Sequence, residues 1–196
     1  MEHNKPKKVE RKFLVYTPDI LLLSNSFILT EITITQTFLT NDDGDCHVRK
    51  ETCNGVTRYY YARKGCDRKN GWRLILEDKE ISETRYNELI ATRPHKKAAV
   101  INKTRYVFSY REQNFNVDIL KDAIRNPEYY PNAEPESEVP EFILPHEKCI
   151  IMIELEHPDE YVEVPRNFIL IKEITNDLDF TTKALAKLLK KQNETN

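Results

Sequence analysis

The sequence predicts an α+β fold that is mainly antiparallel β, with a few helices packed outside a sheet that is able to close on itself. Three observations support this. Apolar and polar residues alternate with a period of two in nine segments, whereas helical periodicity occurs in only two or three. The length of 196 residues is close to one typical domain, so a single domain over residues 1–196 is expected.

Nine segments alternate between apolar and polar residues in the way that half-buried strands do. In chain order they are Val9–Tyr16, Glu31–Thr40, Cys46–Thr52, Thr57–Gly65, Trp72–Glu80, Val100–Tyr110, Phe115–Leu120, Cys149–His157 and Phe168–Thr175.

Three segments predict helices. Asp19–Ser24 is short, and Glu83–Thr92 follows Ser82, a suitable N-cap, and ends before Pro94, which disfavours helix in the residue preceding it. The last helix, Thr181–Gln192, has leucines and alanines at helical spacing and lysines toward its C-terminal end, where they suit the helix dipole.

Turns are expected where asparagine and glycine adopt positive φ at low cost. These positions are Asn41–Gly44, Asn54–Gly55 and Lys69–Gly71. Asn126–Pro145 is rich in proline and glutamate and predicts a loop.

Composition narrows the function. Charged residues make up 32% of the chain but the net charge is only −2, so the excess of positive charge typical of general DNA binders is missing. The 8 Phe and 10 Tyr argue against a disordered chain. The longest apolar run, Ile20–Leu23, is far too short to span a bilayer, and Met1–Lys12 has no apolar signal-peptide core. We therefore expect a cytoplasmic protein without a membrane span.

Several common catalytic motifs do not occur. The sequence contains no CxxC pair, HExxH, GxSxG, Walker loop or GxGxxG, and its four cysteines are too few for a disulfide scaffold. These observations disfavour zinc enzymes, serine hydrolases and nucleotide-binding domains of the common types.

Many predicted strands carry charges on one face and apolar residues on the other, as in Lys103 and Arg105, or Glu154 and Glu156. These faces either meet water on a one-sided sheet or point into a closed barrel whose apolar outside is covered. Buried charges are costly unless they are paired or bound to ions, so an inward arrangement would be a ligand site. Mixed bases and acids suit a polyphosphate held with Mg²⁺ or Mn²⁺. The pattern alone does not choose between the two arrangements.

Six segments resemble, in order, motifs of the CYTH superfamily, also called triphosphate tunnel metalloenzymes. They are VERKFLV (9–15), EISETRYNELI (80–90), KTRYVF (103–108), FNVDIL (115–120), IELE (153–156) and EITNDLDFTTKALA (173–186). The resemblance extends over nearly the whole chain, from Lys8 to Lys190. The middle of the chain also resembles the CYTH module that some eukaryotic proteins join to a P-loop domain, and these 196 residues contain no P-loop motif.

The resemblance implies an eight-stranded, two-ended β tunnel and a divalent-metal-dependent triphosphatase that acts on tripolyphosphate or a nucleoside or organic triphosphate. The implied partner is a triphosphate-bearing small molecule. The family also contains class IV adenylyl cyclases, but the sequence identifies neither a base for a 3′-hydroxyl nor an adenine pocket.

Particular residues match the family's motifs. The implied catalytic residues are Glu10, Lys12 and Arg105. The implied substrate-binding residues are Lys12, Arg49, Lys64, Lys103, Arg105 and Lys183. The implied ligands of Mg²⁺ or Mn²⁺ are Glu10, Asp118, Glu154, Glu156 and Glu173, with Met152 as the other candidate for the place of Glu156.

The chain departs from the family at three places. Lys8 stands in place of a glutamate, His47 in place of an arginine, and Leu76 with Asp78 in place of two glutamates. A one-residue bulge would instead present Arg73 and Glu77. Because lost carboxylates weaken a site for Mg²⁺, the alternative function is a non-catalytic module that binds a nucleotide, polyphosphate or phosphoinositide.

Overall fold

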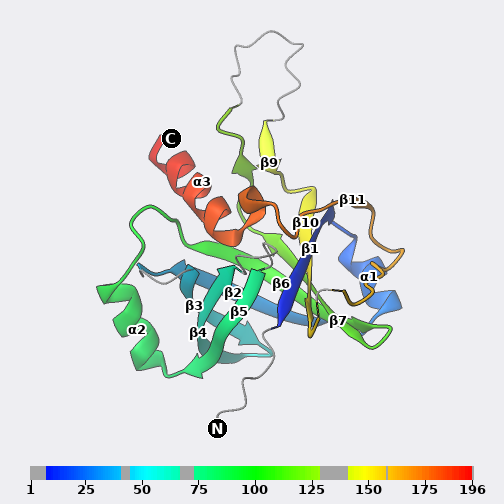
Figure 1. Cartoon of the computed structure of the whole chain (residues 1–196), viewed down its shortest axis with the longest axis horizontal. Helices are drawn as coiled ribbons and strands as arrows, with labels where there is room; N and C mark the ends of the chain where they lie inside the picture. The colour runs from blue at the N-terminus through cyan, green and yellow to red at the C-terminus, as the bar shows by residue number, and fades with distance from the viewer. Residues whose placement is uncertain (1–7, 41–44, 67–72, 129–140, 158, 196) are drawn as a thin grey trace.

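An antiparallel barrel forms the centre of the computed structural model, which describes residues 8–40, 45–66, 73–128, 141–157 and 159–195 (Figure 1). Eight strands close the barrel in the order β10-β7-β6-β2-β3-β4-β5-β1, with β1 pairing back to β10. Their bounds are β1 Val9–Tyr16, β2 Thr30–Phe38, β3 Asp45–Cys53, β4 Val56–Cys66, β5 Arg73–Ile81, β6 Ile101–Tyr110, β7 Gln113–Leu120 and β10 Lys148–Leu155.

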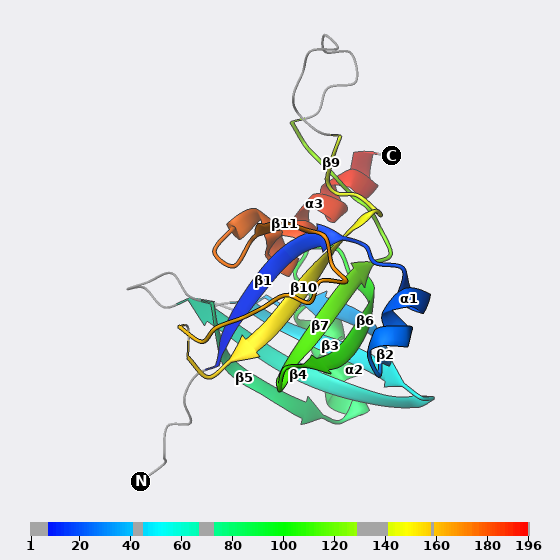
Figure 2. The ribbon, with the colours of Figure 1, turned by 90° about the vertical axis from the view of Figure 1, so that its right-hand side faces the viewer.

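The seam of the barrel lies on β1, which Figure 2 shows crossing the front of the molecule beside β10. All eight residues of β1 pair with β10, from Val9↔Leu155 to Tyr16↔Lys148. Within the described ranges, its other edge pairs with β5 at Val9↔Leu74. Farther along this edge, β11 (Leu170–Glu173) pairs with Phe13 to Val15. The two strands together cover the free edge of β1.

Two apolar clusters on the outward side of the barrel are covered by helices. Helix α1 (Ile20–Ser26), capped by Asp19, adds Leu23 to a cluster on β1, β6, β7 and β10 that includes Phe115. Helix α2 (Glu83–Thr92), capped by Ser82, packs Tyr86 and Leu89 on β3 and β4. None of the helices in the described ranges is long and apolar enough to cross a membrane.

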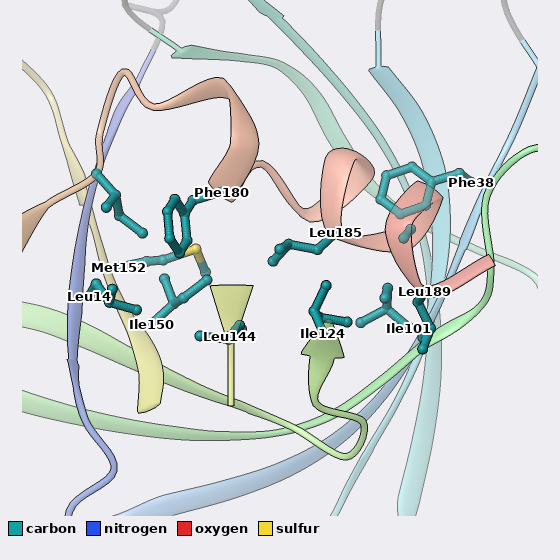
Figure 3. Packing of buried hydrophobic residues seen from close by; sticks show 12 residues of the cluster. Leu14, Phe38, Ile101, Ile124, Leu144, Ile150, Met152, Phe180, Leu185 and Leu189 are labelled. Atoms are coloured by element: carbon teal, nitrogen blue, oxygen red, sulfur yellow. The ribbon is translucent and has the colours of Figure 1, made fainter. Parts of the chain in front are cut away.

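The inward faces change from charged to apolar along the barrel. On β1, Glu10, Lys12 and Leu14 share the inward face, and Leu14 is opposite Ile150 of β10. Leu185 and Leu189 of helix α3 (Thr182–Thr195) pack with these apolar residues (Figure 3). Helix α3 and the preceding 3₁₀ turn η1 (Leu178–Phe180) therefore close one end of the barrel with hydrocarbon, and the charged side chains lie toward the rest of the interior.

The sequence predictions agree with most elements. The bounds of β1 and α2 are as predicted, and Asn54 and Gly55 adopt φ of 49° and 77° in the β3–β4 hairpin. The predicted loop 126–145 needs a correction, because β9 (Phe142–Leu144) pairs there with β8 (Ile124–Arg125). The predicted turns at 41–44 and 69–71, Trp72 and most of that loop lie outside the described residues.

Candidate functional site

A charged cavity occupies the barrel interior. Among the described residues that line it, six are lysine or arginine and four are aspartate or glutamate. The basic residues are Lys12, Arg49, Lys64, Lys103, Arg105 and Lys183, and the acidic residues are Glu10, Asp45, Asp78 and Glu154. The volume open to the centres of water molecules is about 80 Å³; because one water needs roughly 10–15 Å³ on this measure, the cavity has room for several.

Glu10 joins two of the cavity lysines. Its side chain is 3% exposed, with Oε1 2.7 Å from Nζ of Lys64 and Oε2 3.4 Å from Nζ of Lys12. Lys12 is two residues along β1 and so shares the inward face, whereas Lys64 reaches Glu10 from β4. The buried carboxylate therefore holds two ammonium groups from different strands side by side.

Asp118 of β7 joins the two basic residues of β6. Its carboxylate accepts hydrogen bonds from Nζ of Lys103 at 2.5 Å and from Nε and Nη2 of Arg105 at 2.6 and 2.9 Å. Burial favours the neutral acid, but the guanidinium of Arg105 and the ammonium of Lys103 outweigh it and lower the pKa of Asp118. Burial lowers the pKa of Lys103 to about 8 although Asp118 opposes the shift. Burial also disfavours the charged form of Arg105, yet Asp118 raises the pKa of this guanidinium.

Arg49 of β3 is held in a third ion cluster. Its Nε donates to Glu51 at 2.5 Å, and its Nη2 donates to both carboxylate oxygens of Asp78 at 3.0 Å. The guanidinium carbon lies 4.7 Å from the centre of the Tyr60 ring. These contacts fix a planar, permanently charged group at the cavity wall.

Helix α3 brings the sixth cation. Nζ of Lys183 lies 2.9 Å from Oδ1 of Asp45 at the start of β3, and Thr182, the first residue of the helix, also lines the cavity. The N-terminus of a helix carries unpaired N–H groups and partial positive charge. Helix α3 therefore presents both a lysine and its positive end to the cavity.

His47 lies among these cations, between Asp45 and Arg49 on the inward face of β3. It is 4% exposed and lines the cavity beside Phe38, whose ring centre is 5.7 Å from that of the imidazole. Burial, followed by the charges of Lys64, Arg49 and Lys103, lowers the pKa of His47 well below its usual value. The imidazole is therefore neutral at pH 7 in this structure.

A bulge in β5 changes which residues of this strand line the cavity. The β4–β5 register shifts between Arg63 and Lys64, so that Ile75 and Asp78 both line the cavity. The expected pair of Leu76 and Asp78 is corrected to Ile75 and Asp78, because the bulge changes which side chains point inward. Glu77 instead contacts Arg63 and Lys79, and the side chain of Arg73 lies outside the described set. Gln36 of β2 and Asp45 of β3 also line the cavity, and the sequence analysis singled out neither of them.

Three of the five expected metal ligands do not line this cavity. Asp118 is bonded to the lining residues Lys103 and Arg105, and the other two acids lie elsewhere. Glu173 pairs with Arg11, with Nη2–Oε2 at 2.8 Å, because β11 aligns it with Phe13 on the outward face of β1. The hydrogen bond from Arg11 lowers the pKa of this carboxyl. Glu156 is 54% exposed at a neighbouring hollow, where Nζ of Lys8 lies 3.9 Å from it and 3.8 Å from Glu154. Glu154 borders both the cavity and this hollow, whereas Met152 lines the cavity.

The acidic side chains do not form a metal site as they are arranged here. In the described ranges, no three histidine, cysteine, aspartate or glutamate residues are grouped so that they could hold a metal ion. The lysine and arginine pairs explain why, since Glu10, Asp78 and Asp118 each face a cation. Of the expected Mg²⁺ or Mn²⁺ ligands, the structure brings Glu10 and Glu154 together at the cavity, and it places Asp118, Glu156 and Glu173 apart from them.

The fold and the cavity define a closed antiparallel barrel with a cation-rich interior and covered apolar faces. No family model matches the chain, and no curated protein matches it. Several solved structures are similar to it in fold. The inorganic triphosphatase NE1496 is 20% identical with a TM-score of 0.46, over 92% of this chain and 94% of that chain. The PH1819 protein from Pyrococcus horikoshii OT3 is 18% identical with a TM-score of 0.47, over 95% and 89%.

A third similar structure is the Schizosaccharomyces pombe Mediator head module, at 11% identity and a TM-score of 0.46 over 80% of this chain and 86% of that chain. Fold and function are separable, and at such low identities and TM-scores these likenesses do not say what the chain does. The eight-stranded antiparallel barrel is nevertheless the architecture that the CYTH resemblance implies.

Proposed function

We propose that the barrel cavity binds the triphosphate group of a small molecule. The observation that carries this proposal is the convergence of six lysine and arginine side chains, from four strands and one helix, on one enclosed space. Cations on separate strands are held in this arrangement at a cost, because each charge is removed from water. A polyanion bound in this space would offset that cost by electrostatic attraction to the cations.

The chemistry of the donors suits phosphate oxygens. A guanidinium carries five N–H donors and an ammonium three, and both bind phosphate through charge-assisted hydrogen bonds. The positive end of α3 at Thr182 adds to the attraction. A chain of phosphates in the cavity would be surrounded by donors from α3, β1, β3, β4 and β6, each of which contributes at least one lining lysine or arginine.

The cations are already paired with carboxylates, so a ligand must share them. Lys64 and Arg49 keep 22% and 15% of their side chains exposed, and the hydrogen bonds described above use only part of the donors of Arg49. A phosphate oxygen therefore has donors to bind while the carboxylate partners remain. Because this arrangement needs no metal ligand, binding is the function that the geometry supports best.

Hydrolysis of the triphosphate is the second candidate, and one observation favours it. Glu10 and Glu154 are direct partners in the β1–β10 ladder, and both line the cavity. Mg²⁺ is typically bound by one or two carboxylates together with substrate phosphates, so these two facing carboxylates are suited to a divalent ion. Cations beside both carboxylates weaken this candidate, because Lys64 and Lys12 compensate the charge of Glu10 and Lys8 compensates that of Glu154.

A thermal-shift experiment tests the proposed binding. Tripolyphosphate and ATP are compared with inorganic phosphate and with sodium chloride at equal ionic strength. Ligand at about 100 times its Kd adds roughly 2.7 kcal/mol, which raises the Tm of a protein of this size by about 5–10 °C. If neither triphosphate raises the Tm of the protein more than the matched salt does, the proposal is wrong.

Two neighbouring residues of β4 supply the matched variants. Lys64 lines the cavity, and Arg63 points outward to Glu77. Lys64→Gln is expected to weaken tripolyphosphate binding about tenfold or more, since it removes a charged hydrogen-bond donor. Arg63→Gln should bind as the wild type does. Equal affinities of the two variants would place the bound anion outside the cavity.

Phosphate release separates the two candidates. The protein is incubated with tripolyphosphate or ATP, with Mg²⁺ or Mn²⁺ and with EDTA, and released phosphate is measured against Lys12→Gln. Release that depends on the divalent ion and is lost in Lys12→Gln supports hydrolysis. Binding without release leaves the non-catalytic function, whereas release that Lys12→Gln retains comes from a different enzyme in the preparation.

A further inference from the structure

His47 is placed where a bound polyanion would lie. It lines the same cavity as the six cations, on the inward face of β3, and only 4% of the residue is exposed. In the ladders it is opposite Phe38 of β2 and Ala62 of β4. The ring therefore has an apolar residue beside it on each neighbouring strand, and it lines the cavity.

Charged groups face His47 from four strands. Lys64 of β4, Arg49 of β3 and Lys103 of β6 repel a proton on the imidazole, and Glu10 of β1 attracts one. Burial of the ring, together with three positive charges against one negative charge, keeps His47 neutral while the cavity holds no anion. The balance changes sign when several negative phosphate oxygens enter the same space.

We propose that His47 is a further anion-binding residue of the cavity, and that it takes up a proton as the polyphosphate binds. This inference rests on the proposed function, since it requires a polyanion in the cavity. Neutral imidazole has one N–H donor, whereas imidazolium has two and carries a charge. Protonation makes His47 the seventh positively charged side chain that can donate hydrogen bonds to the anion.

The linkage has a definite sign. The free protein binds few protons at His47 near pH 6.5, and the complex binds more, so affinity for the polyphosphate rises as the pH falls. Because His47 is neutral in the free protein, the cavity contains one buried positive charge fewer before the anion binds. The proton arrives only with the negative charge that stabilises it.

A second cavity group takes up protons at higher pH. Burial sets the pKa of Lys103 to about 8, so an anion would also raise the proton occupancy of this lysine, chiefly above pH 7. Proton uptake measured near pH 6.5 therefore comes from His47 and from the phosphate groups of the ligand. A variant of His47 removes the contribution of the imidazole and keeps that of the ligand.

Isothermal titration calorimetry with tripolyphosphate tests the inference. The full chain is titrated at pH 6.5 in two buffers with different ionisation enthalpies, because the difference in heat counts the protons taken up. The wild type should take up of the order of 0.5–1 proton more per bound anion than His47→Gln. His146→Gln, which changes an exposed histidine, should match the wild type.

Equal proton uptake by the wild type and His47→Gln would overturn the inference and leave the proposed function standing. No binding of tripolyphosphate by the wild type would overturn both. An NMR titration of the His47 ring protons in the wild type needs no variant: saturating tripolyphosphate should raise the pKa of His47 at least to the pH of the calorimetry, and an unchanged pKa would contradict the inference.

Discussion

Arg105 and Asp118 are direct partners in the β6–β7 ladder, and the guanidinium of Arg105 donates to both carboxylate oxygens, from Nε at 2.6 Å and from Nη2 at 2.9 Å. The same carboxylate accepts a hydrogen bond from Lys103. One acid therefore holds two cations of the cavity in place from behind. This relationship makes the site a rigid part of the barrel, and its loss has a predictable cost.

Asp118→Asn should destabilise the protein strongly, because it leaves Lys103 and Arg105 buried without their counterion. Removing one partner of a buried ion pair typically costs about 3–5 kcal/mol. Urea unfolding monitored by circular dichroism measures the change. The matched control is Glu173→Gln, which breaks the half-exposed pair with Arg11 and should cost about 0–1 kcal/mol. Equal losses in the two variants would show that Asp118 has no special role.

The lowered pKa of Lys103 predicts how the stability of the protein changes at alkaline pH. Its pKa is about 8 in the folded protein and near 10.5 in the unfolded chain. Between these values the unfolded chain binds the proton that the folded protein lacks, so the contribution of Lys103 to stability rises with pH, by the order of 1–3 kcal/mol. Urea midpoints at pH 7.5, 9 and 10 measure it. Lys103→Met should lack this rise, and a wild type that tracks the variant at every pH would contradict the prediction.

The apolar end of the barrel predicts a cost for shortening α3 side chains. Leu185 is 1% exposed and packs with Ile101, Ile124 and Leu144 inside the closed end. Leu185→Ala should lower the free energy of unfolding by about 2–5 kcal/mol, since it leaves a cavity. Leu178 is 70% exposed on the preceding turn, and Leu178→Ala should change stability by less than about 0.5 kcal/mol. A small effect of Leu185→Ala would mean that α3 does not close the barrel.

The sequence predicted much of the fold because alternation and caps are local signals. β1 and α2 are found at their predicted bounds, since both depend on neighbouring residues alone. The three-residue strand β9 was missed because it is too short to show a period. The predicted inward charges of β1, β3, β4 and β6 are confirmed as lining residues, while their binding roles remain predictions.

The sequence did not predict the register in which the strands pair. Glu173 was expected with the metal ligands, but the alignment of β11 with Phe13 of β1 directs it outward to Arg11. The bulge in β5 likewise brings Ile75 inward in place of Leu76. Pairing partners and bulges depend on distant strands, and a shift of one residue reverses every side chain on a strand.

The most direct test of the central claim observes the cavity arginines themselves. Tripolyphosphate is titrated into ¹⁵N-labelled protein while the Nε–Hε signals of Arg49, Arg105, Arg11 and Arg63 are followed by NMR. The account predicts saturable shifts for Arg49 and Arg105, which line the cavity, and none for Arg11 and Arg63, which pair with acids outside it. Saturable shifts confined to Arg11 and Arg63, or no shift of any of the four, would contradict it.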